Sequence, residues 1–168
     1  GGPAAGPASA ADPEQFIEAF GMHLAAGQVM VRGFTPAMKE AGYGRIINVI
    51  STSVREPIPN LGVSNTIRGS VASWAKTVSG ELPPGVTINN VLPGFTDTDR
   101  LGSLAKGRAE RSGSTTEGVY ELWRSQIPEG RLGRPEELAS VIAFLASPAA
   151  SYIRGVSLPV DGGRLRSI

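Results

Sequence analysis

The sequence contains no cysteine, which excludes disulfide bonds, thiol catalysis and thiolate metal sites. Its single histidine, His23, rules out a site with several histidine ligands, so we expect no metal site, and a Ser-His-Asp hydrolase would depend on that residue alone. No apolar run approaches the roughly 18–20 residues that cross a bilayer. Lysine and arginine total 16 against 15 acidic residues, and this net charge of +1 gives no reason to expect nucleic acid or an acidic membrane as a partner.

Glycine and proline are abundant instead, with 22 and 13 of the 168 residues. They fall between apolar segments and therefore indicate turns. The length, with 40% hydrophobic and 18% charged residues, fits one globular domain over residues 1–168. The chain opens without a basic residue before Arg32 and without a continuous apolar stretch, so it shows no secretory signal and we expect a cytoplasmic protein.

Apolar periodicity predicts helices alternating with short, almost entirely apolar strands. The helices are expected at 12–36, 64–82 and from 135 onward, and the strands at 45–51, 86–94 and 156–163. Pro36 is expected to kink or end the first helix. The polar stretch 97–128 is expected to be a mobile loop or lid with one short helix at 117–125. Helices alternating with buried strands predict an α/β fold with a parallel sheet.

Polar side chains are predicted to collect where the strands end. Ser51 and Ser53 end the first strand, residues 93–98 follow the second, and residues 64–68 open the helix between them. Ligands of open α/β sheets bind beyond the carboxyl ends of the strands. Hydroxyls, a guanidinium and a helix N-terminus would suit a phosphate or a polar carbonyl ligand. The alternative is that these hydroxyls cap helices and that the arginine is a surface residue.

Four strings, in this order and spacing, carry a resemblance to a known family: GRIINVIS, NNVLPGFTDT, GRLGRPEELASVIAFLASPAASYIRG and PVDGG. The sequence resembles the latter half of short-chain dehydrogenases/reductases, and within them the divergent relatives of β-ketoacyl carrier-protein reductase. The resemblance covers essentially the whole chain. It implies a Rossmann-like, doubly wound parallel sheet and an oxidoreductase that uses NAD or NADP on a small carbonyl or alcohol substrate.

The opening GGPAAGP resembles the turn that follows the fourth strand of that family. No G-x-x-x-G-x-G or G-x-G-x-x-G string occurs in the 168 residues. The resemblance therefore implies that the chain is the C-terminal portion of a larger protein, without the N-terminal nucleotide-binding strands. The choice between NAD and NADP is normally set in that missing part.

The family's catalytic residues carry over only in part. Its serine matches Ser51, but Ser64 stands where tyrosine is expected thirteen residues later, and Arg68 stands where lysine is expected four residues after that. The family's asparagine falls on His23. Tyrosine passes a proton to or from the substrate oxygen in that family, and lysine lowers the tyrosine pKa. Serine is too weak an acid for that task, and arginine cannot shuttle protons.

Polar donors nevertheless persist at each of these positions, so we take Ser51, Ser64, Arg68 and His23 as the catalytic candidates. Ser51 and Ser64 could orient a carbonyl, and Arg68 could hold a ribose or phosphate. Tyr43, Tyr120 or His23 could supply a different acid. The alternative interpretations are that Tyr43 is a turn residue, that Tyr120 packs within the lid and that His23 is a histidine on a helix face. A His23–Ser51 hydrolase dyad is disfavoured because no G-x-S-x-G elbow is present.

The cofactor contacts implied by the resemblance lie after the second strand. Pro93, Gly94 and Thr98 match the family's Pro-Gly-x-x-x-Thr, which runs along the nicotinamide and pyrophosphate, and Phe95 is expected to cover the nicotinamide edge. Arg68 is the fifth candidate for cofactor binding. An ordinary strand-to-loop turn is the alternative. Residues 99–128 correspond to the substrate loop, which varies most in the family and names no substrate.

The helices around 13–38 and 64–82 carry wide apolar faces, with Phe16, Phe20 and Leu24 on the first and Ile67, Val71 and Trp74 on the second. The family builds a dimer from these helices, so we expect a homodimer or tetramer. Three functions stay open: an oxidoreductase with altered acid/base residues, a nucleotide- or metabolite-binding protein without turnover, and an interaction protein that keeps only the helical interface. Cofactor oxidation and cofactor binding separate the three.

Overall fold

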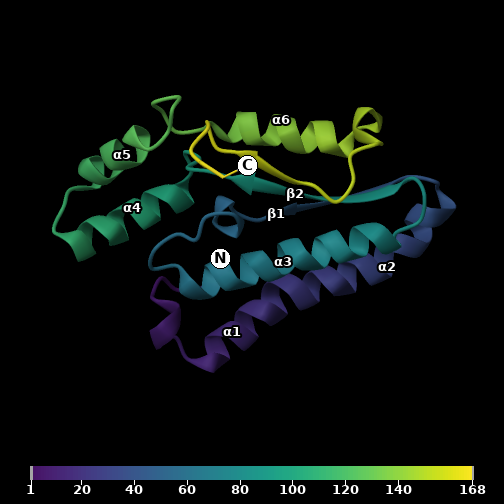
Figure 1. Cartoon of the computed structure of the whole chain (residues 1–168), viewed down its shortest axis with the longest axis horizontal. Coiled ribbons are helices and arrows are strands. Elements are labelled where there is room, and N and C mark those ends of the chain that lie inside the picture. Colours follow the sequence, from purple (N-terminus) through teal and green to yellow (C-terminus); the bar gives the residue numbers. More distant parts are fainter. Residues whose placement is uncertain (1, 168) are drawn as a thin grey trace.

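The computed structural model describes residues 2–167 and has a parallel three-stranded sheet at its centre (Figure 1). The strands β1 (Gly44–Val49), β2 (Val86–Pro93) and β3 (Ser157–Val160) lie in the order β1-β2-β3. The register pairs Ile46 with Ile88 and Val91 with Leu158. This arrangement confirms the predicted α/β fold. The strands end slightly earlier than the apolar runs that predicted them.

Helices cover both faces of the sheet, as Figure 1 shows. On one face lie α1 (Pro13–Phe20), α2 (Ala26–Glu40) and α3 (Gly62–Glu81), and α6 (Pro135–Ala146) lies on the other. Short turns of 3-10 helix occur at η1 (Ala8–Ala10), η3 (Thr52–Val54) and η4 (Pro148–Ala150). A parallel sheet with helices on both faces is the doubly wound type of α/β architecture.

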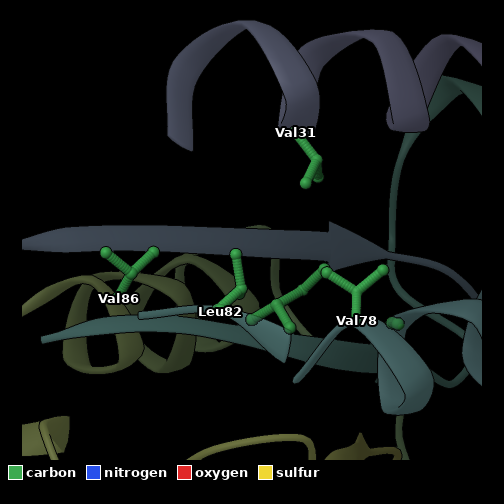
Figure 2. Close-up of a cluster of buried hydrophobic side chains, with 6 residues drawn as sticks. Val31, Val78, Leu82 and Val86 are labelled. Carbon is green, nitrogen blue, oxygen red and sulfur yellow. The ribbon is translucent and has the colours of Figure 1, made fainter. Parts of the chain in front are cut away.

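The central strand β2 is covered on both faces, which explains why most of its residues are apolar. Its side chains alternate between the two faces, so Val86 and Ile88 pack against the α2–α3 side while Val91 packs with Leu145 under α6. Figure 2 shows Val31 of α2 pointing toward the cluster that Val78, Leu82 and Val86 form. Burial on both faces requires apolar side chains at nearly every position.

Three buried residues of β2 depart from this apolar pattern, namely Thr87, Asn89 and Asn90. The Asn89 side chain donates to Ile153 O at 2.9 Å and accepts from Val156 N at 3.1 Å. The Asn90 amide accepts from Asn48 Nδ2 at 2.9 Å and donates to Ser157 Oγ at 3.0 Å. These bonds satisfy polar groups that would otherwise be buried at a cost, and they join the central strand to both its neighbours.

The first helix is longer and less regular than predicted. A π-helical segment, η2 (Gly21–Ala25), joins α1 to α2 without a break, and α2 continues past Pro36 to Glu40. Proline removes the bond that would reach Arg32 O, but both residues are exposed, so water can satisfy that carbonyl. Of the two outcomes expected for Pro36, an end of the helix is wrong, because α2 continues to Glu40.

The prediction of a loop at 97–128 was also wrong in most of its length. The structure has α4 (Asp99–Ser112) and α5 (Thr116–Ser125) there, and only the second of them was expected. The two helices share a core of their own, consisting of Leu101, Ala105, Ala109, Val119 and Trp123. Thr98 and Thr115 cap their N-termini, and Gly113 ends α4 in the left-handed conformation, at φ 65°.

The apolar faces of the long helices differ from those expected. Ile67 and Val71 of α3 are buried within the chain, in clusters with Ala19 and Leu92 respectively, so they are not free for a partner. Several of the exposed apolar side chains lie instead along α1 and α2. We call this set the α1–α2 apolar face: Ile17, Phe20, Val29, Met30 and Phe34.

Two kinds of feature are absent from residues 2–167. None of the helices there combines the length and the apolar character needed to cross a bilayer. Histidine, aspartate and glutamate side chains in that range do not come together in any group of three that could hold a metal ion.

Candidate functional site

Ser51 lies just beyond the carboxyl end of β1. Its side-chain oxygen accepts a hydrogen bond from Ser53 N at 3.0 Å, which begins the short turn η3. Because Ser51 accepts in this bond, its hydroxyl proton is still available to donate to a ligand. The side chain is half-buried at the edge of the sheet where ligands of parallel sheets bind.

Ser64 and Arg68 lie in the first turns of α3, one helical turn apart and therefore on the same side of the helix. Both are half-buried. The Arg68 guanidinium reaches the end of β1, where Nη1 donates a long hydrogen bond of 3.4 Å to Val49 O. The structure thus brings the start of α3 to the strand end that precedes Ser51.

His23 lies in the π-helical segment η2, which packs against α3. Its Nε2 is buried and has no hydrogen-bond partner within residues 2–167. Burial lowers the pKa of His23 below its ordinary value of 6.5, and the nearby Arg68 guanidinium lowers that pKa further. The imidazole is therefore mainly neutral at pH 7. Of the four predicted catalytic residues, Ser51 follows β1 and Arg68 contacts its end, while Ser64 stands one helical turn before Arg68 and His23 lies near Arg68.

The two tyrosines considered as alternative acids lie elsewhere. Tyr43 precedes β1 at its amino end, donates to Ala146 O and stacks beneath the Arg45 guanidinium, 4.3 Å from the ring centroid. Tyr120 packs edge-on against Trp123 in the core of α4 and α5. Neither tyrosine lies near Ser51. Tyr43 is a residue of the turn before β1, and Tyr120 packs in the core that α4 and α5 share.

Pro93 is the last residue of the central strand β2, and Gly94 follows it. Gly94 N donates to Val160 O at 2.9 Å, which ties the end of β2 to the end of β3. A Cβ at Gly94 would lie 2.7 Å from Asp161 Cα, so chain packing alone requires glycine here. A role for Pro93 and Gly94 in cofactor binding stays a prediction.

Phe95 and Thr98 both have contacts within the chain. The Phe95 ring stacks on Trp123 at 4.9 Å between centroids, and the Arg164 guanidinium lies 4.8 Å from the Phe95 centroid. Thr98 Oγ1 accepts from Leu101 N at 3.3 Å as the N-cap of α4. These contacts position the loop after β2, and cofactor contacts of either side chain stay a prediction.

Sequence reasoning did not find Arg100, which stands in the first turn of α4. A Cβ on Gly2 would lie 3.6 Å from its Nη2, so the side chain reaches the N-terminal segment. Arg100 also lies close enough to Arg68 to lower the Arg68 pKa by charge repulsion, second to the effect of burial. The spacing of residues in the sequence could not predict a role for Arg100, because Arg100 and α3 are far apart in sequence and come near each other only in the folded chain.

A cavity of about 160 Å³ lies next to Phe95, between the loop after β2 and the start of α6. An ion-paired group lines it in part: Arg131 Nη2 lies 2.8 Å and Arg134 Nη2 3.2 Å from Glu137 Oε1. The cavity is smaller than the roughly 300–1,000 Å³ of typical ligand pockets. It is therefore too small for a dinucleotide.

The Glu137 carboxylate makes the free energy of unfolding depend on pH in the acid range. The Arg131 side chain and the Arg134 backbone N–H lower its pKa from 4.5 to about 2. A group with a lowered folded-state pKa adds stability above its unfolded value and loses it as pH falls through its folded value. Between pH about 5 and about 2, Glu137→Gln is therefore expected to lose less stability than the wild type, as measured by urea unfolding at each pH.

The neighbouring Glu136, which is exposed and has no ion pair among the described residues, provides a matched control. Glu136→Gln should follow the wild-type curve through the same pH range. Equal slopes for Glu137→Gln and the wild type would show that the ion pairs add no acid-sensitive stability.

Comparisons with known proteins show to which family the chain belongs. The enoyl-(acyl carrier protein) reductase family model matches residues 2–164. The chain is 38% identical over 130 residues to the short-chain reductase protein NovJ of Streptomyces niveus, covering 76% of this chain and 47% of NovJ. It is 40% identical over 129 residues to the 3-oxoacyl-[acyl-carrier-protein] reductase FabG of Vibrio cholerae, covering 75% and 48%. The chain spans about half the length of these curated relatives.

Solved structures show the same fold. YwfH, an NADPH-dependent reductase involved in bacilysin biosynthesis, superposes with a TM-score of 0.92 at 30% identity over 100% of this chain and 65% of YwfH. A 3-ketoacyl-(acyl-carrier-protein) reductase from Brucella melitensis, complexed with NADH, gives a TM-score of 0.79 at 34% identity over 97% and 63%. With a matching family model and a parallel sheet of this architecture, the chain belongs to the short-chain dehydrogenase/reductase family and is similar to its ketoacyl reductases.

Proposed function

We propose that this chain carries the catalytic residues of an NAD(P)-dependent oxidoreductase that acts on a carbonyl or hydroxyl group, with Ser64 and Arg68 in place of tyrosine and lysine. The observation that carries the proposal is the contact of Arg68 with the end of β1, the strand that Ser51 follows, with Ser64 one helical turn before Arg68 and His23 near it. Membership of the family supports the reaction class. The relatives named as NADPH-dependent reductases, BacG of Bacillus subtilis and YwfH, support the cofactor class.

The residues present fit a nicotinamide cofactor. The Arg68 guanidinium makes one hydrogen bond within residues 2–167, a long bond from Nη1. Its other N–H donors are therefore available to a ribose or phosphate. Pro93 ends the neighbouring strand β2, and Thr98 lies on the loop that follows it. When bound, the cofactor would supply or accept the hydride, while the side chains of this chain orient the substrate and handle the proton.

Each candidate has a distinct chemical role. Ser51 can donate its hydroxyl proton to a substrate oxygen, and the positive charge of Arg68 stabilises negative charge that develops on that oxygen. His23 is neutral at pH 7, so it can accept a proton during oxidation of an alcohol. The reverse reaction would need the protonated imidazole, and the lowered pKa makes that form scarce near neutral pH.

The test is cofactor-dependent turnover with substrates of the kinds that the relatives' names give, namely diacetyl, an acetoacetyl thioester and L-sorbose. Ser51→Ala should lower kcat/KM about 10²-fold, the usual cost of removing one donor to a reacting oxygen. Ser53→Ala is the matched control, because Ser53 lies in the same turn and its buried Oγ has no partner among the described residues. It should change kcat/KM by less than about twofold.

Binding without turnover is the second candidate, and the replacement of tyrosine by Ser64 favours it, since a serine hydroxyl is a weak acid. A chain that binds NADH or NADPH but reduces none of the three substrates would support this candidate. A chain that neither binds a cofactor nor turns over would leave a role in interaction only. Equal loss of activity in Ser51→Ala and Ser53→Ala would contradict the assignment of Ser51.

We also propose that the chain self-associates through the α1–α2 apolar face. Five large apolar side chains there are between 46% and 70% exposed, although monomeric proteins rarely leave such continuous apolar patches in water. A second copy that offers the same face would bury them by two-fold symmetry. The residues of α3 named in the sequence interpretation do not contribute, because the chain itself buries Ile67 and Val71.

A further inference from the structure

The side chain of Arg164 contacts the segments that follow the first two strands. Its Nη1 donates a hydrogen bond of 3.2 Å to Thr52 Oγ1, in the turn η3 directly after Ser51. Its guanidinium carbon also lies 4.8 Å from the centroid of the Phe95 ring, in the loop after β2. Arg164 itself lies in the segment after β3. One side chain therefore connects the carboxyl ends of all three strands.

Two carboxylates hold the backbone of the C-terminal segment, residues 161–167. The Asp161 carboxylate accepts from two backbone N–H groups that follow it, at 3.1 and 2.8 Å. Glu56 Oε1, two residues beyond η3, accepts from the last two backbone N–H groups of the segment, at 2.8 and 3.0 Å. Figure 1 shows this segment in yellow beside the end of β2. The segment is thus fixed by bonds that do not use the Arg164 side chain, and a substitution there tests that side chain alone.

Thr52 is the residue through which Arg164 acts on Ser51. Thr52 is 2% exposed, and Ser51 Oγ accepts from Ser53 N at 3.0 Å, so the three consecutive residues form one turn. A hydrogen bond from a charged donor is stronger than one between neutral groups, so it restricts the motion of this short turn. Nε of Arg164 is buried without a partner among the described residues. The bond to Thr52 and the contact with Phe95 help to offset the burial of this cation.

We propose that Arg164 is a positioning residue, which fixes the turn of Ser51 relative to the Phe95 loop and so orients the Ser51 hydroxyl toward the substrate oxygen. The inference rests on the proposed function for the role of Ser51, whereas the restraint on the turn does not depend on it. A misplacement of about 1 Å at a reacting group can lower the rate about 100-fold. Loss of one of several restraints should therefore lower kcat and leave substrate binding almost unchanged.

The kinetic test compares three variants in the same turnover assay. Arg164→Met keeps the length of the side chain and removes its charge and donors, so kcat should fall about tenfold while KM changes by less than about twofold. Arg164→Lys keeps a charge for Phe95 and a donor for Thr52, so its kcat should be at least about threefold above that of Arg164→Met. Arg166→Met is the matched control, because the Arg166 side chain is exposed and makes no hydrogen bond or ion pair within residues 2–167. It should leave kcat unchanged within about twofold.

Hydrogen exchange of backbone amides tests the restraint without turnover. The N–H of Ser53, which donates to Ser51 Oγ, should exchange about fivefold faster in Arg164→Met, the usual effect of losing one hydrogen bond. The N–H of Asn90, which bonds to Val156 O in the sheet, should exchange at the wild-type rate. Thr52→Val removes the acceptor, so it should give the same increase at Ser53, and Arg164→Met should add nothing to it.

The two measurements separate this inference from the proposed reaction. Unchanged exchange at Ser53 in Arg164→Met would overturn the positioning role, whether or not the wild type turns over. A rise in KM alone, or an equal fall of kcat in Arg166→Met, would overturn it as well. A wild type without turnover would contradict the proposed reaction, while faster exchange at Ser53 alone would still support the restraint on the turn.

Discussion

Truncation of Leu92 to alanine is expected to lower the free energy of unfolding by about 3 kcal/mol, a factor of roughly 150 in the folding equilibrium. Leu92 has no exposed surface and packs with Ile50 and Val71 between β2, the end of β1 and α3. Removing its branched end takes apolar atoms out of the core and leaves a cavity that the parallel strands cannot close. Urea unfolding at fixed protein concentration measures the change.

Leu122→Ala is the matched control for this substitution. Leu122 lies on α5 and is 43% exposed, so its truncation removes little buried surface and should cost less than about 1 kcal/mol. Similar losses in the two variants would show that Leu92 is not packed as the structure places it. The urea dependence m should be the same in both, which confirms that only stability has changed.

A chain with Met30→Glu and Phe34→Glu is expected to run as a monomer of 17.5 kDa, while the wild type runs with at least twice that mass. The two residues lie one helical turn apart on α2 and are 57% and 52% exposed. Four glutamates brought together across a two-fold interface would repel one another and would lose their water, so association should weaken at least about 100-fold. Light scattering on the eluting peak gives the mass.

Tyr152→Glu tests whether any exposed apolar residue has this effect. Tyr152 is fully exposed, in the turn after η4, and is not part of the α1–α2 apolar face. The mass of this variant should equal that of the wild type. A wild-type chain that is already monomeric over the whole concentration range would contradict self-association, and dissociation by Tyr152→Glu would place the interface elsewhere.

Most of the sheet could be predicted from the sequence, because burial leaves a strong local signal. β2 is covered on both faces, so apolar residues run through it, and the helices beside it carry wide apolar stripes. The helix α4 left no such signal. Its buried side chains, Leu101, Ala105 and Ala109, form one narrow row four residues apart, two of them alanines among charged residues. A segment of that composition is typical of a polar loop.

The sequence could suggest candidate site residues only where they lie close together along the chain at regular intervals. Ser51, Ser64 and Arg68 follow one another along a strand, a turn and a helix start, so their intervals are visible in one stretch of sequence. Arg100 comes from α4, and its proximity to Arg68 is a product of the tertiary fold. The π-helical segment that holds His23 could not be predicted either. A π-helical turn contains one residue more than an α-helical turn, and the amino-acid composition of the segment does not reveal it.

The central place of β2 has a consequence for the order in which the chain folds. Its bonds to β1 join residues 42 apart, and those to β3 join residues 67 apart. Closing the longer loop costs only about 0.4 kcal/mol more than closing the shorter one, which is less than the thermal energy of about 0.6 kcal/mol. Loop entropy therefore ranks neither pairing first. The helices can form in microseconds, whereas both edges of β2 wait for distant partners, so assembly around this one strand sets the folding rate.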